Sequence, residues 1–565
     1  MHLTRSHRNR IWLSSSAARL KGRLVPFATA LVQTHHATLI LGLLVVAAVQ
    51  FWRLWPIQSV LDWPLWDESN YAASGAAWMH HGGSLGDLHT SPLYIASYGL
   101  LSCFGDLPFA IFAQHYLVKI ISTALLYVLF ARLWNSWVAA AAFALLWGAT
   151  QFQLEFPILV YQFAWLWFLA ALVTIDVWPI CGLELLALAV CVRQEYQFAL
   201  LLAVCWLPWK AWRDRWTIRQ WFAPKGGLTS AIFGSSICVI LSLLIAFIAS
   251  HTAFRHSADR LWFAFEQHYA VRAVAVKETA ITNPWLDYPK VVQKDFPGAR
   301  SLSGAARINP SAFAKHIEFN LVHAPLEVFG LFSFPSGVGV VVALLSIVAI
   351  AGLGAATAPM MRDLGKSELI WITALGGIIA IVPTLVVFSK GAYLLPAVPI
   401  VVLSISALVS ILLSSILKSP AITYLGATVF FIAILQSLTT PKQFQIGSRP
   451  RPVAETMPIL QNLWPTHGRE ALVAVAASSY AHYIGDDRCL AVEAISEVAG
   501  FNSKLSFAQL VQANHPFAVM VTDEWRQSTR FTEAEILDSL PKGKWRQLEV
   551  PAGTLYLRNA GGKPH

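Results

Sequence analysis

The stretch ATLILGLLVVAAVQFWRLW, from Ala37 to Trp55, decides the fold class of this chain. It is an apolar run with the length that a helix needs to cross a membrane. It follows a long basic segment, which differs from the short basic region of a cleavable signal peptide and indicates a retained first span. Similar runs recur along the chain and predict about eleven transmembrane helices.

The composition of the whole chain agrees with a multi-span α-helical membrane protein. Among its 565 residues, 56% are hydrophobic and 13% are charged, whereas a soluble domain usually has about 25% charged residues. Its 23 tryptophans are typical of the aromatic belts that form at membrane interfaces. The expected spans are 37–57, 107–131, 136–154, 157–177, 179–192, 196–209, 228–250, 327–355, 369–388, 392–416 and 420–438.

Basic residues set the expected orientation of these spans. Much of the net charge of +10 is gathered in the N-terminal segment 1–36 and in the loop from Lys210 to Lys225. Such blocks are typical of cytoplasmic loops rather than of nucleic-acid binding. With the N-terminus in the cytoplasm, Arg132 also falls inside. The loops 58–106 and 251–326 then fall outside, and an odd number of spans puts the tail outside as well.

The tail has a different character from the rest of the chain. It contains short strand-like runs, ALVAVAAS, FAVMVTDEW and TLYLRN, with helical stretches between them. A proline-rich linker, GSRPRPVAETMP, precedes them. We therefore expect a cytoplasmic N-terminus at 1–36, a transmembrane domain at 37–438 and a small extracytoplasmic α/β domain at 439–565.

The first outer loop contains an adjacent pair of acids. In LDWPLWDESNYAASGAAWMHHGG, from Leu61 to Gly83, tryptophans and a tyrosine flank Asp67 and Glu68. Aromatic side chains favour the headgroup level of a membrane, and ESNYAASGAAWMHHG predicts a short interfacial helix. The plain alternative is a pair of solvated carboxylates in a wet loop. The position and flanking residues favour a functional pair.

Several short motifs together resemble the glycosyltransferase C superfamily. They are the acid pair followed by Tyr71 and HTSPLY, the segment CVRQEY around Arg193, and FSKGAYLLPAVP around Lys390. The resemblance is to the branch that contains the protein O-mannosyltransferases and the lipid A aminoarabinose transferase. It covers most of the chain, including the tail.

The resemblance implies a membrane enzyme, in a bacterial inner membrane, that takes a sugar from a polyprenyl-phosphate carrier. The acceptor would be a hydroxyl of an extracytoplasmic glycan, lipid or protein. Asp67 would be the general base, and Glu68 would orient Asp67 or bind an acceptor hydroxyl. Direct displacement with inversion is expected, because no second carboxylate is evident as a nucleophile.

Three residues are expected to hold the donor phosphate. Arg193 is the first, because a charged arginine between two apolar runs is costly and tends to be functional. Lys390 is the second cation, and Tyr393 could hydrogen-bond the same phosphate. The alternatives are that Arg193 pairs with Glu195 or extends to the interface, and that the other two are ordinary interfacial residues.

The acceptor side is expected to include Glu155, His89 and Tyr71. The loop histidines could hold a metal with Asp67, but their spacing matches no metal motif, so we expect no metal and no cofactor and keep a divalent ion as an alternative. Arginines of the second outer loop are interpreted as a solvated face: Arg255, Arg260 and Arg272. The six cysteines show no metal-ligand spacing and are interpreted as small core residues.

A different class of function stays open, a transporter or flippase for a lipid-linked substrate. Against it, the hydropathy shows no two-fold repeat, and few polar residues lie in mid-span. Lys119 is an exception, whose side chain can extend to the interface. A third alternative is a scaffold whose tail binds a partner. The expected polar site residues fall at one face of the membrane, which favours an enzyme.

Overall fold

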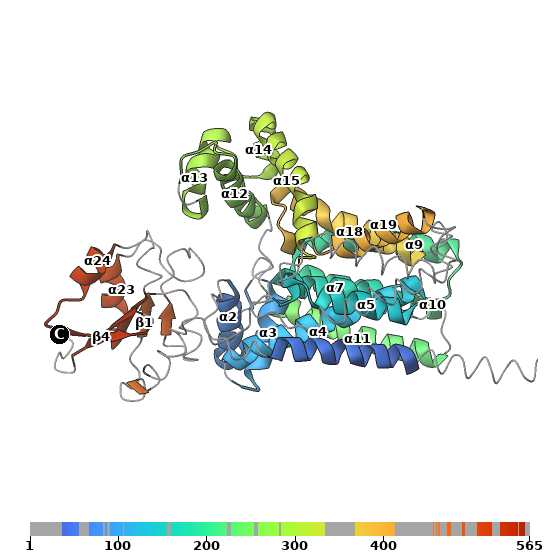
Figure 1. Cartoon of the computed structure of the whole chain (residues 1–565), viewed down its shortest axis with the longest axis horizontal. Coiled ribbons are helices and arrows are strands. Elements are labelled where there is room, and N and C mark those ends of the chain that lie inside the picture. Colours follow the sequence, from blue (N-terminus) through green and yellow to red (C-terminus); the bar gives the residue numbers. More distant parts are fainter. Residues whose placement is uncertain are drawn as a thin grey trace, which may run out of the picture.

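The computed structural model is a helical bundle with a small C-terminal sheet (Figure 1). It describes residues 37–55, 67–82, 85–86, 91–105, 107–154, 160–222, 228–252, 258–281, 284–333, 368–412, 456, 459, 462–463, 472–475, 489–491, 506–522, 532–551 and 553–559. The basic N-terminus, the expected span at 420–438 and most of the one at 327–355 lie outside these residues.

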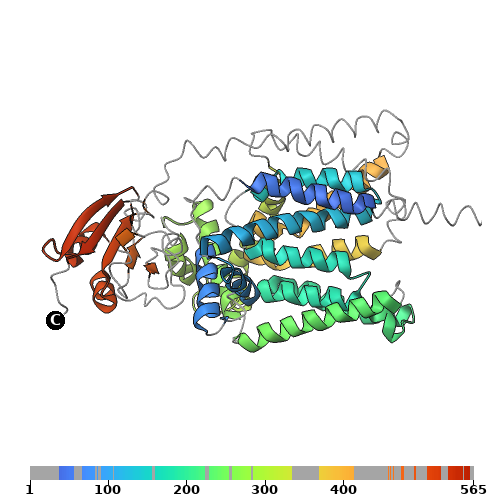
Figure 2. The ribbon, with the colours of Figure 1, turned by 90° about the horizontal axis from the view of Figure 1, so that it is seen from below.

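Four helices are long and apolar enough to cross a membrane within the described part of the chain. They are the helix Ala37–Leu54, α4 (Leu107–Trp134), α11 (Leu228–His251) and α18 (Glu368–Val387). They run in roughly the same direction along the bundle, with the helix Ala37–Leu54 and α11 at opposite sides of it (Figures 1 and 2). The described helices are thus compatible with a helical membrane protein.

Other helices of the bundle are described over fewer than the roughly 20 residues of a full span. They are α5 (Trp137–Gly148), α7 (Val160–Thr174), α8 (Pro179–Val192), α9 (Gln197–Arg213) and α19 (Ala397–Leu412), with the single turn α6 (Gln151–Leu154). Ser136 caps the start of α5, and Pro179 lies in the first turn of α8, so local signals set where these two helices begin. The prediction of eleven spans is therefore not confirmed.

The core of the bundle is rich in tryptophan. Trp134, Trp147 and Trp165 are fully buried, and the Trp134 indole N–H donates to the Ser406 hydroxyl at 3.2 Å. These side chains fill space between helices because a large aromatic ring buries much apolar area. The interpretation of the tryptophans as interfacial belts is therefore wrong for these three, while Trp52 and Trp212 are exposed as expected.

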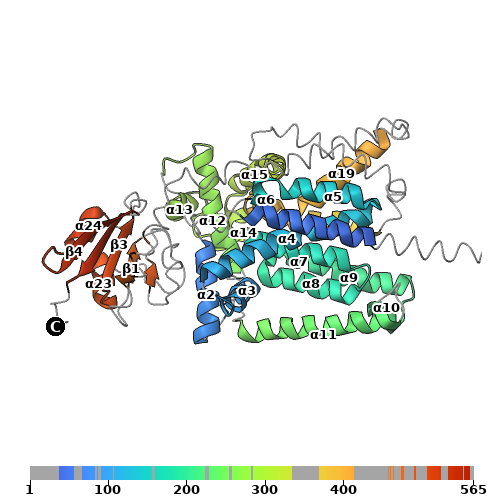
Figure 3. The same ribbon diagram turned by 60° about the horizontal axis from the view of Figure 1, so that its bottom comes forward.

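One end of the bundle, here called the α2 end, carries additional helices that do not run with the bundle (Figure 3). They are α2 (Asp67–His81), α3 (Pro92–Ser102), α12 (Ala258–Ala275), α13 (Pro284–Asp295), α14 (Leu302–Ile308) and α15 (Pro310–Gly330). A separate apolar cluster around Phe265 holds α12, α13 and α14 together. The two expected outer loops thus lie at the same end.

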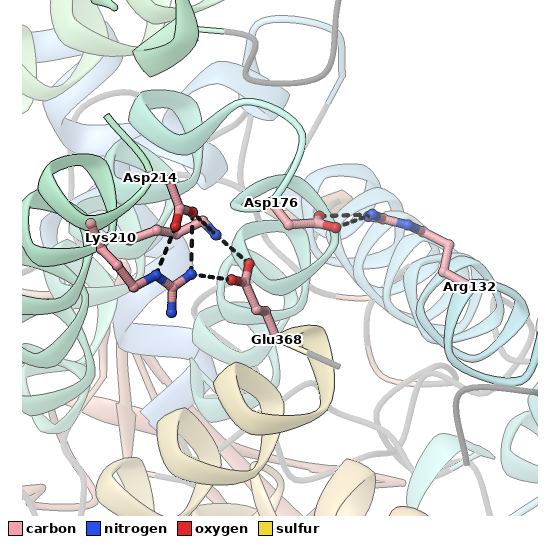
Figure 4. A network of polar contacts seen from close by, with 6 residues as sticks. Arg132, Asp176, Lys210, Asp214 and Glu368 are labelled. Carbon is pink, nitrogen blue, oxygen red and sulfur yellow. Dashed lines mark hydrogen bonds and ion pairs between the residues drawn. The ribbon is translucent and has the colours of Figure 1, made fainter. Parts of the chain in front are cut away.

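The opposite end, here called the Arg132 end, is held by ion pairs (Figure 4). Arg132 in the last turn of α4 donates to both oxygens of Asp176, at 2.6 and 2.7 Å. Lys210 and Arg213 at the end of α9 share Glu368 at the start of α18. Arg132 and the basic block after Lys210 therefore lie at one end of the bundle, as the charge pattern predicts.

The sheet has the strand order β2-β1-β3-β5-β4. The first three strands are parallel, and the last two are antiparallel to their neighbours. The elements are β1 (Leu472–Val475), β2 (Cys489–Ala491), α23 (Phe507–Asn514), β3 (Ala518–Thr522), α24 (Glu533–Ser539), β4 (Trp545–Val550) and β5 (Gly553–Arg558). The three predicted strand-like runs are β1, β3 and β5. The sheet lies beyond the α2 end in all views (Figures 1, 2 and 3).

The packing of α2 on α3 depends on two glycines, and this gives the first testable prediction. A Cβ placed on Gly75 would lie 2.7 Å from the backbone N of Gly99. Gly75→Ala is therefore expected to lower the free energy of unfolding by about 1–3 kcal/mol. The control is Gly330→Ala, where a Cβ meets no atom within 4 Å. Thermal unfolding of both variants measures the effect, and equal melting temperatures would contradict the prediction.

Candidate active site

Glu68 is the buried acid of the predicted pair. It is the second residue of α2, is 2% exposed, and accepts hydrogen bonds from the hydroxyls of Tyr94 and Tyr98 on α3, the second at 2.6 Å. Burial and the Glu68 carboxylate raise the pKa of both phenols well above their usual value. Both phenols therefore stay protonated and donate, so Glu68 joins α2 to α3.

Asp67 is the first residue of α2, and its side chain lies outside the described part of the chain. Tyr71, one turn further along α2, is half-buried and lies edge-on to Tyr94 with ring centroids 5.3 Å apart. Tyr71 is also close enough to Arg193 to act on its charge. The first turn of α2 therefore reaches the neighbourhood of the predicted phosphate ligand.

Arg193 lies where α8 stops and the chain turns into α9. Its extended backbone ends α8, and a short 3-10 helix, η3 (Gln194–Tyr196), follows. The guanidinium is held by Glu195, with Nε and Nη2 donating at 3.2 and 2.5 Å. The pairing that the sequence left as an alternative is therefore present. Among the described residues, no hydrogen bond involves Nη1, and that nitrogen can donate to a ligand.

Two tyrosines enclose the same guanidinium. The Arg193 carbon Cζ lies 4.1 Å from the ring centroid of Tyr161 on α7 and 5.8 Å from that of Tyr393. Tyr393 belongs to the 3-10 helix η5 (Gly391–Leu394), and its hydroxyl lies 2.5 Å from that of Tyr161. Two of the three predicted phosphate-binding residues are thus brought together from distant parts of the sequence.

Arg193, Glu195 and Tyr393 line a pocket of about 150 Å³. Apolar side chains of α9, α12 and α18 form most of its remaining wall, among them Phe198 and Leu261. Arg193 is only 8% exposed. Glu195 compensates the charge of Arg193 within the pocket, so an anion would be bound there mainly through the remaining donor, Nη1, where little water competes. The pocket therefore combines one anion ligand with apolar walls.

His268 on α12 also lines this pocket and was not predicted from the sequence. Its ring stacks on Phe388, with centroids 4.3 Å apart, and lies 6.2 Å from the ring of Tyr393. Lys390, the third predicted phosphate ligand, is exposed, and its charge reaches His268. His268 and Phe388 are 120 residues apart in the sequence, so only the folded structure shows that His268 belongs to this site. No local motif marks it.

The buried imidazole of His268 gives a prediction for acid stability. Burial, followed by the charges of His316, Lys390 and Arg193, lowers the pKa of His268 to about 3. The unfolded chain therefore takes up the proton first as the pH falls below about 6.5, and stability is lost progressively between that pH and about 3. His268→Gln is expected to melt lower at neutral pH but to lose less on acidification. Equal slopes of melting temperature against pH would contradict this.

A second, larger pocket of about 290 Å³ lies between α9 and α18. Its lining is almost entirely apolar, with contributions from Phe168, Trp206 and Leu375, and it reaches Arg213 and Glu368 at the Arg132 end. The first pocket lies between the opposite ends of the same two helices. The α9–α18 boundary is therefore hollowed near both ends.

The described residues do not place every predicted residue in this site. Glu155 and His89 lie outside the described residues. His80 lies 3.2 Å from the Ser102 hydroxyl and joins α2 to α3. Arg272 is 3% exposed and pairs with Glu278, so its interpretation as part of a solvated face is wrong. Tyr269, one turn earlier on α12, packs against its guanidinium.

Lys119 differs from its interpretation, as do the exposed Cys103 and Cys205, whereas Cys181 and Cys238 are core residues as expected. Lys119 is buried in the bundle and donates to the carbonyl oxygen of Phe152 at 2.7 Å, so its side chain does not extend to the interface. Cys181 and Cys238, far apart in sequence, bring their sulfur atoms to 3.0 Å. A sequence spacing rule cannot detect such a pair, because it joins two different helices.

Comparison with known proteins adds no family to this description. No protein-family model matches the chain, and no curated protein matches it.

Proposed function

We propose that this protein transfers a sugar from a polyprenyl-phosphate carrier to a hydroxyl of a glycan, lipid or protein acceptor. The observation that supports it most is Arg193, a buried guanidinium in a pocket with apolar walls. A lipid phosphate has the matching chemistry, since its head is anionic and its tail is apolar. On this proposal the α2 end and the C-terminal sheet face the outside of a bacterial inner membrane.

The phosphate would be held by three groups. Arg193 would donate through Nη1 while Glu195 fixes its plane, and Tyr393 would donate through its hydroxyl. Lys390 would add a second positive charge from the exposed side of η5. These groups stabilise the negative charge that grows on the phosphate as the sugar leaves, which lowers the barrier.

The polyprenyl chain would follow the apolar pocket between α9 and α18. This pocket lies along the same helix pair as the Arg193 pocket, and its lining is aliphatic and aromatic. A bound isoprenoid would bury apolar surface there, which stabilises the complex by about 25 cal/mol per Å² of buried area. The carrier would therefore reach the site from the membrane.

The acceptor would arrive at the α2 end. Asp67 would take the proton of the acceptor hydroxyl as that oxygen attacks the sugar, and the carrier phosphate would leave with the bonding electrons. Glu68 supports the start of α2 through Tyr94 and Tyr98. Tyr71, Glu155 and His89 remain proposed acceptor contacts. No step of this scheme requires a metal or a cofactor.

A transporter of a lipid-linked substrate is the second candidate. Buried cations inside the bundle favour it, since Lys119 bonds to the Phe152 carbonyl and Arg53 bonds to the Leu145 carbonyl at 2.8 Å. Both cations donate hydrogen bonds to backbone oxygens inside the bundle, whereas Arg193 lines a pocket. The transferase accounts for the Arg193 pocket and the acid pair together.

The proposal is tested by offering the purified protein a panel of polyprenyl-phosphate sugars in detergent, together with membrane extract as a source of acceptors. Conversion of one donor to free polyprenyl phosphate, with the sugar recovered on an acceptor, is expected. Reactions with and without chelator test the metal alternative. Folded protein that binds a donor and converts none would contradict the proposal and favour the transporter.

A further inference from the structure

A cluster of sulfur and oxygen atoms lies between α8 and α11, away from the candidate active site. Cys181 and Glu184 are three residues apart on α8, and Cys238 and Ser242 are four residues apart on α11. These spacings place each pair on one face of its helix. Ligand atoms of Cys181, Glu184 and Cys238 all lie within 4.8 Å of one another.

The polar atoms of this cluster are incompletely satisfied. The Ser242 hydroxyl donates to Glu184 Oε1 at 2.6 Å. The other carboxylate oxygen, Oε2, is buried, and no hydrogen bond of normal geometry reaches it from the described residues. The Cys238 thiol is its neighbour across the two helices. Cys181 and Cys238 are buried, with their sulfur atoms 3.0 Å apart. The cluster itself contains no Lys or Arg.

A cation would stabilise the ionised form of an acid in such a place. The helices around it are among the most apolar of the chain, and a carboxylate in apolar surroundings is costly unless a positive charge compensates it. Thiolates and a carboxylate from facing helices form a ligand set that borderline-soft metal ions prefer. The serine is placed to orient the carboxylate, as partners of metal ligands commonly are.

We propose that Cys181, Glu184 and Cys238 bind a thiophilic metal ion of the Zn²⁺ class and that the ion joins α8 to α11. Two S–M bonds and one O–M bond form, the two thiol protons leave to solvent, and no electron is transferred. Zn–S bonds of about 2.3 Å in a tetrahedral site put the sulfurs about 3.8 Å apart, so they separate by rotation of the cysteine side chains.

A disulfide between the two cysteines is the competing use of the same sulfurs. It would form an S–S bond and would need a two-electron oxidant, whereas the metal needs none. It would also leave Glu184 Oε2 without a positive partner in apolar surroundings. The carboxylate is therefore the feature that favours the metal.

The ion has a short path from solvent. Cys181 is the third residue of α8, and Asp176, which pairs with Arg132 at the Arg132 end, lies five residues before it. The ligands thus lie within about two helical turns of that polar end. This site is separate from the Arg193 pocket, so its occupancy does not rest on the proposed transfer reaction.

The test uses full-length protein in lipid nanodiscs, reduced, stripped with chelator and then loaded with Zn²⁺ or Co²⁺. Elemental analysis is expected to find about one Zn²⁺ per chain, and Co²⁺ is expected to give sulfur-to-cobalt charge-transfer absorption. Loading is also expected to raise the melting temperature, because the ion binds the folded state only. Reduced wild-type protein without bound Zn²⁺ or the cobalt band would overturn the proposal.

Variants locate the ion. Cys181→Ser and Cys238→Ser are expected to lose binding, and Ser242→Ala to weaken it about 10–100-fold. The controls Cys191→Ser and Cys205→Ser, on α8 and α9, are expected to bind as wild type does. Binding that survives Cys181→Ser and Cys238→Ser, or is lost equally in the controls, would overturn the assignment. Recovery of a Cys181–Cys238 disulfide from protein that takes up no metal would also overturn the assignment. Ser242 is exposed, so Ser242→Ala remains informative if the cysteine variants do not fold.

Discussion

Replacing Asp67 by asparagine is expected to abolish sugar transfer while the protein stays folded. Asparagine has nearly the shape of aspartate, but its amide cannot take the proton that the acceptor hydroxyl loses. Removing a general base slows a reaction by about 10²–10⁴-fold. Glu68 is unsuited to replace it, because two buried tyrosine hydroxyls already donate to Glu68. The measurement is the initial rate of donor consumption by purified variant and wild type.

Asp287→Asn is the matched control for this experiment. Asp287 also lies in a helix at the α2 end, α13, and its carboxylate accepts a hydrogen bond from the exposed Lys290 at 2.5 Å. Its replacement is expected to leave the rate unchanged, because surface pairs contribute little to stability. Full activity of Asp67→Asn would contradict the role of Asp67 and would move the proposed base to Glu155, because two tyrosine hydroxyls already donate to Glu68.

Arg193→Gln is expected to have the second large effect, a fall in kcat/KM of about 10²–10³-fold. Glutamine removes the positive charge from the pocket, so the donor binds more weakly and the leaving phosphate is less stabilised. The variant also leaves Glu195 without its cation, which lowers stability. The double variant with Glu195→Gln is therefore needed, and it is expected to regain melting temperature without regaining kcat/KM.

Arg132→Gln separates a role in phosphate binding from a role in packing. Arg132 also pairs with a carboxylate, that of Asp176, but at the opposite end of the bundle (Figure 4). Its loss is expected to lower the melting temperature and to leave kcat/KM of the folded fraction near wild type. If Arg132→Gln and Arg193→Gln lower kcat/KM equally, the assignment of Arg193 to the donor phosphate is wrong.

Local patterns in the sequence predict much of this fold. Apolar runs mark the bundle helices, and small and aromatic residues after Asp67 mark α2. Three strand-like runs of the tail become β1, β3 and β5. The number of spans is not confirmed in this way, because several apolar runs are helices of fewer than 18 residues in the described part of the chain.

Contacts between distant segments account for what the sequence does not predict. Trp134 is a polar-tipped side chain whose burial depends on another helix, since its indole N–H donates to Ser406 on α19. The pairing of Tyr161 with Tyr393 and the approach of Cys181 to Cys238 join helices that no periodicity connects. The motif around Arg193 predicts its position at a helix end, but only the fold places it in a pocket with His268.

Sugar transfer at the α2 end, without passage of the donor across the membrane, is tested most directly in sealed proteoliposomes of known orientation. A labelled polyprenyl-phosphate sugar is confined to one leaflet at a time, with acceptor on the same side. Conversion to polyprenyl phosphate is expected only when donor and acceptor are on the side of the C-terminal sheet, and none is expected with Asp67→Asn. Passage of intact donor to the other leaflet, without loss of its sugar on either side, would contradict the transferase and identify a transporter.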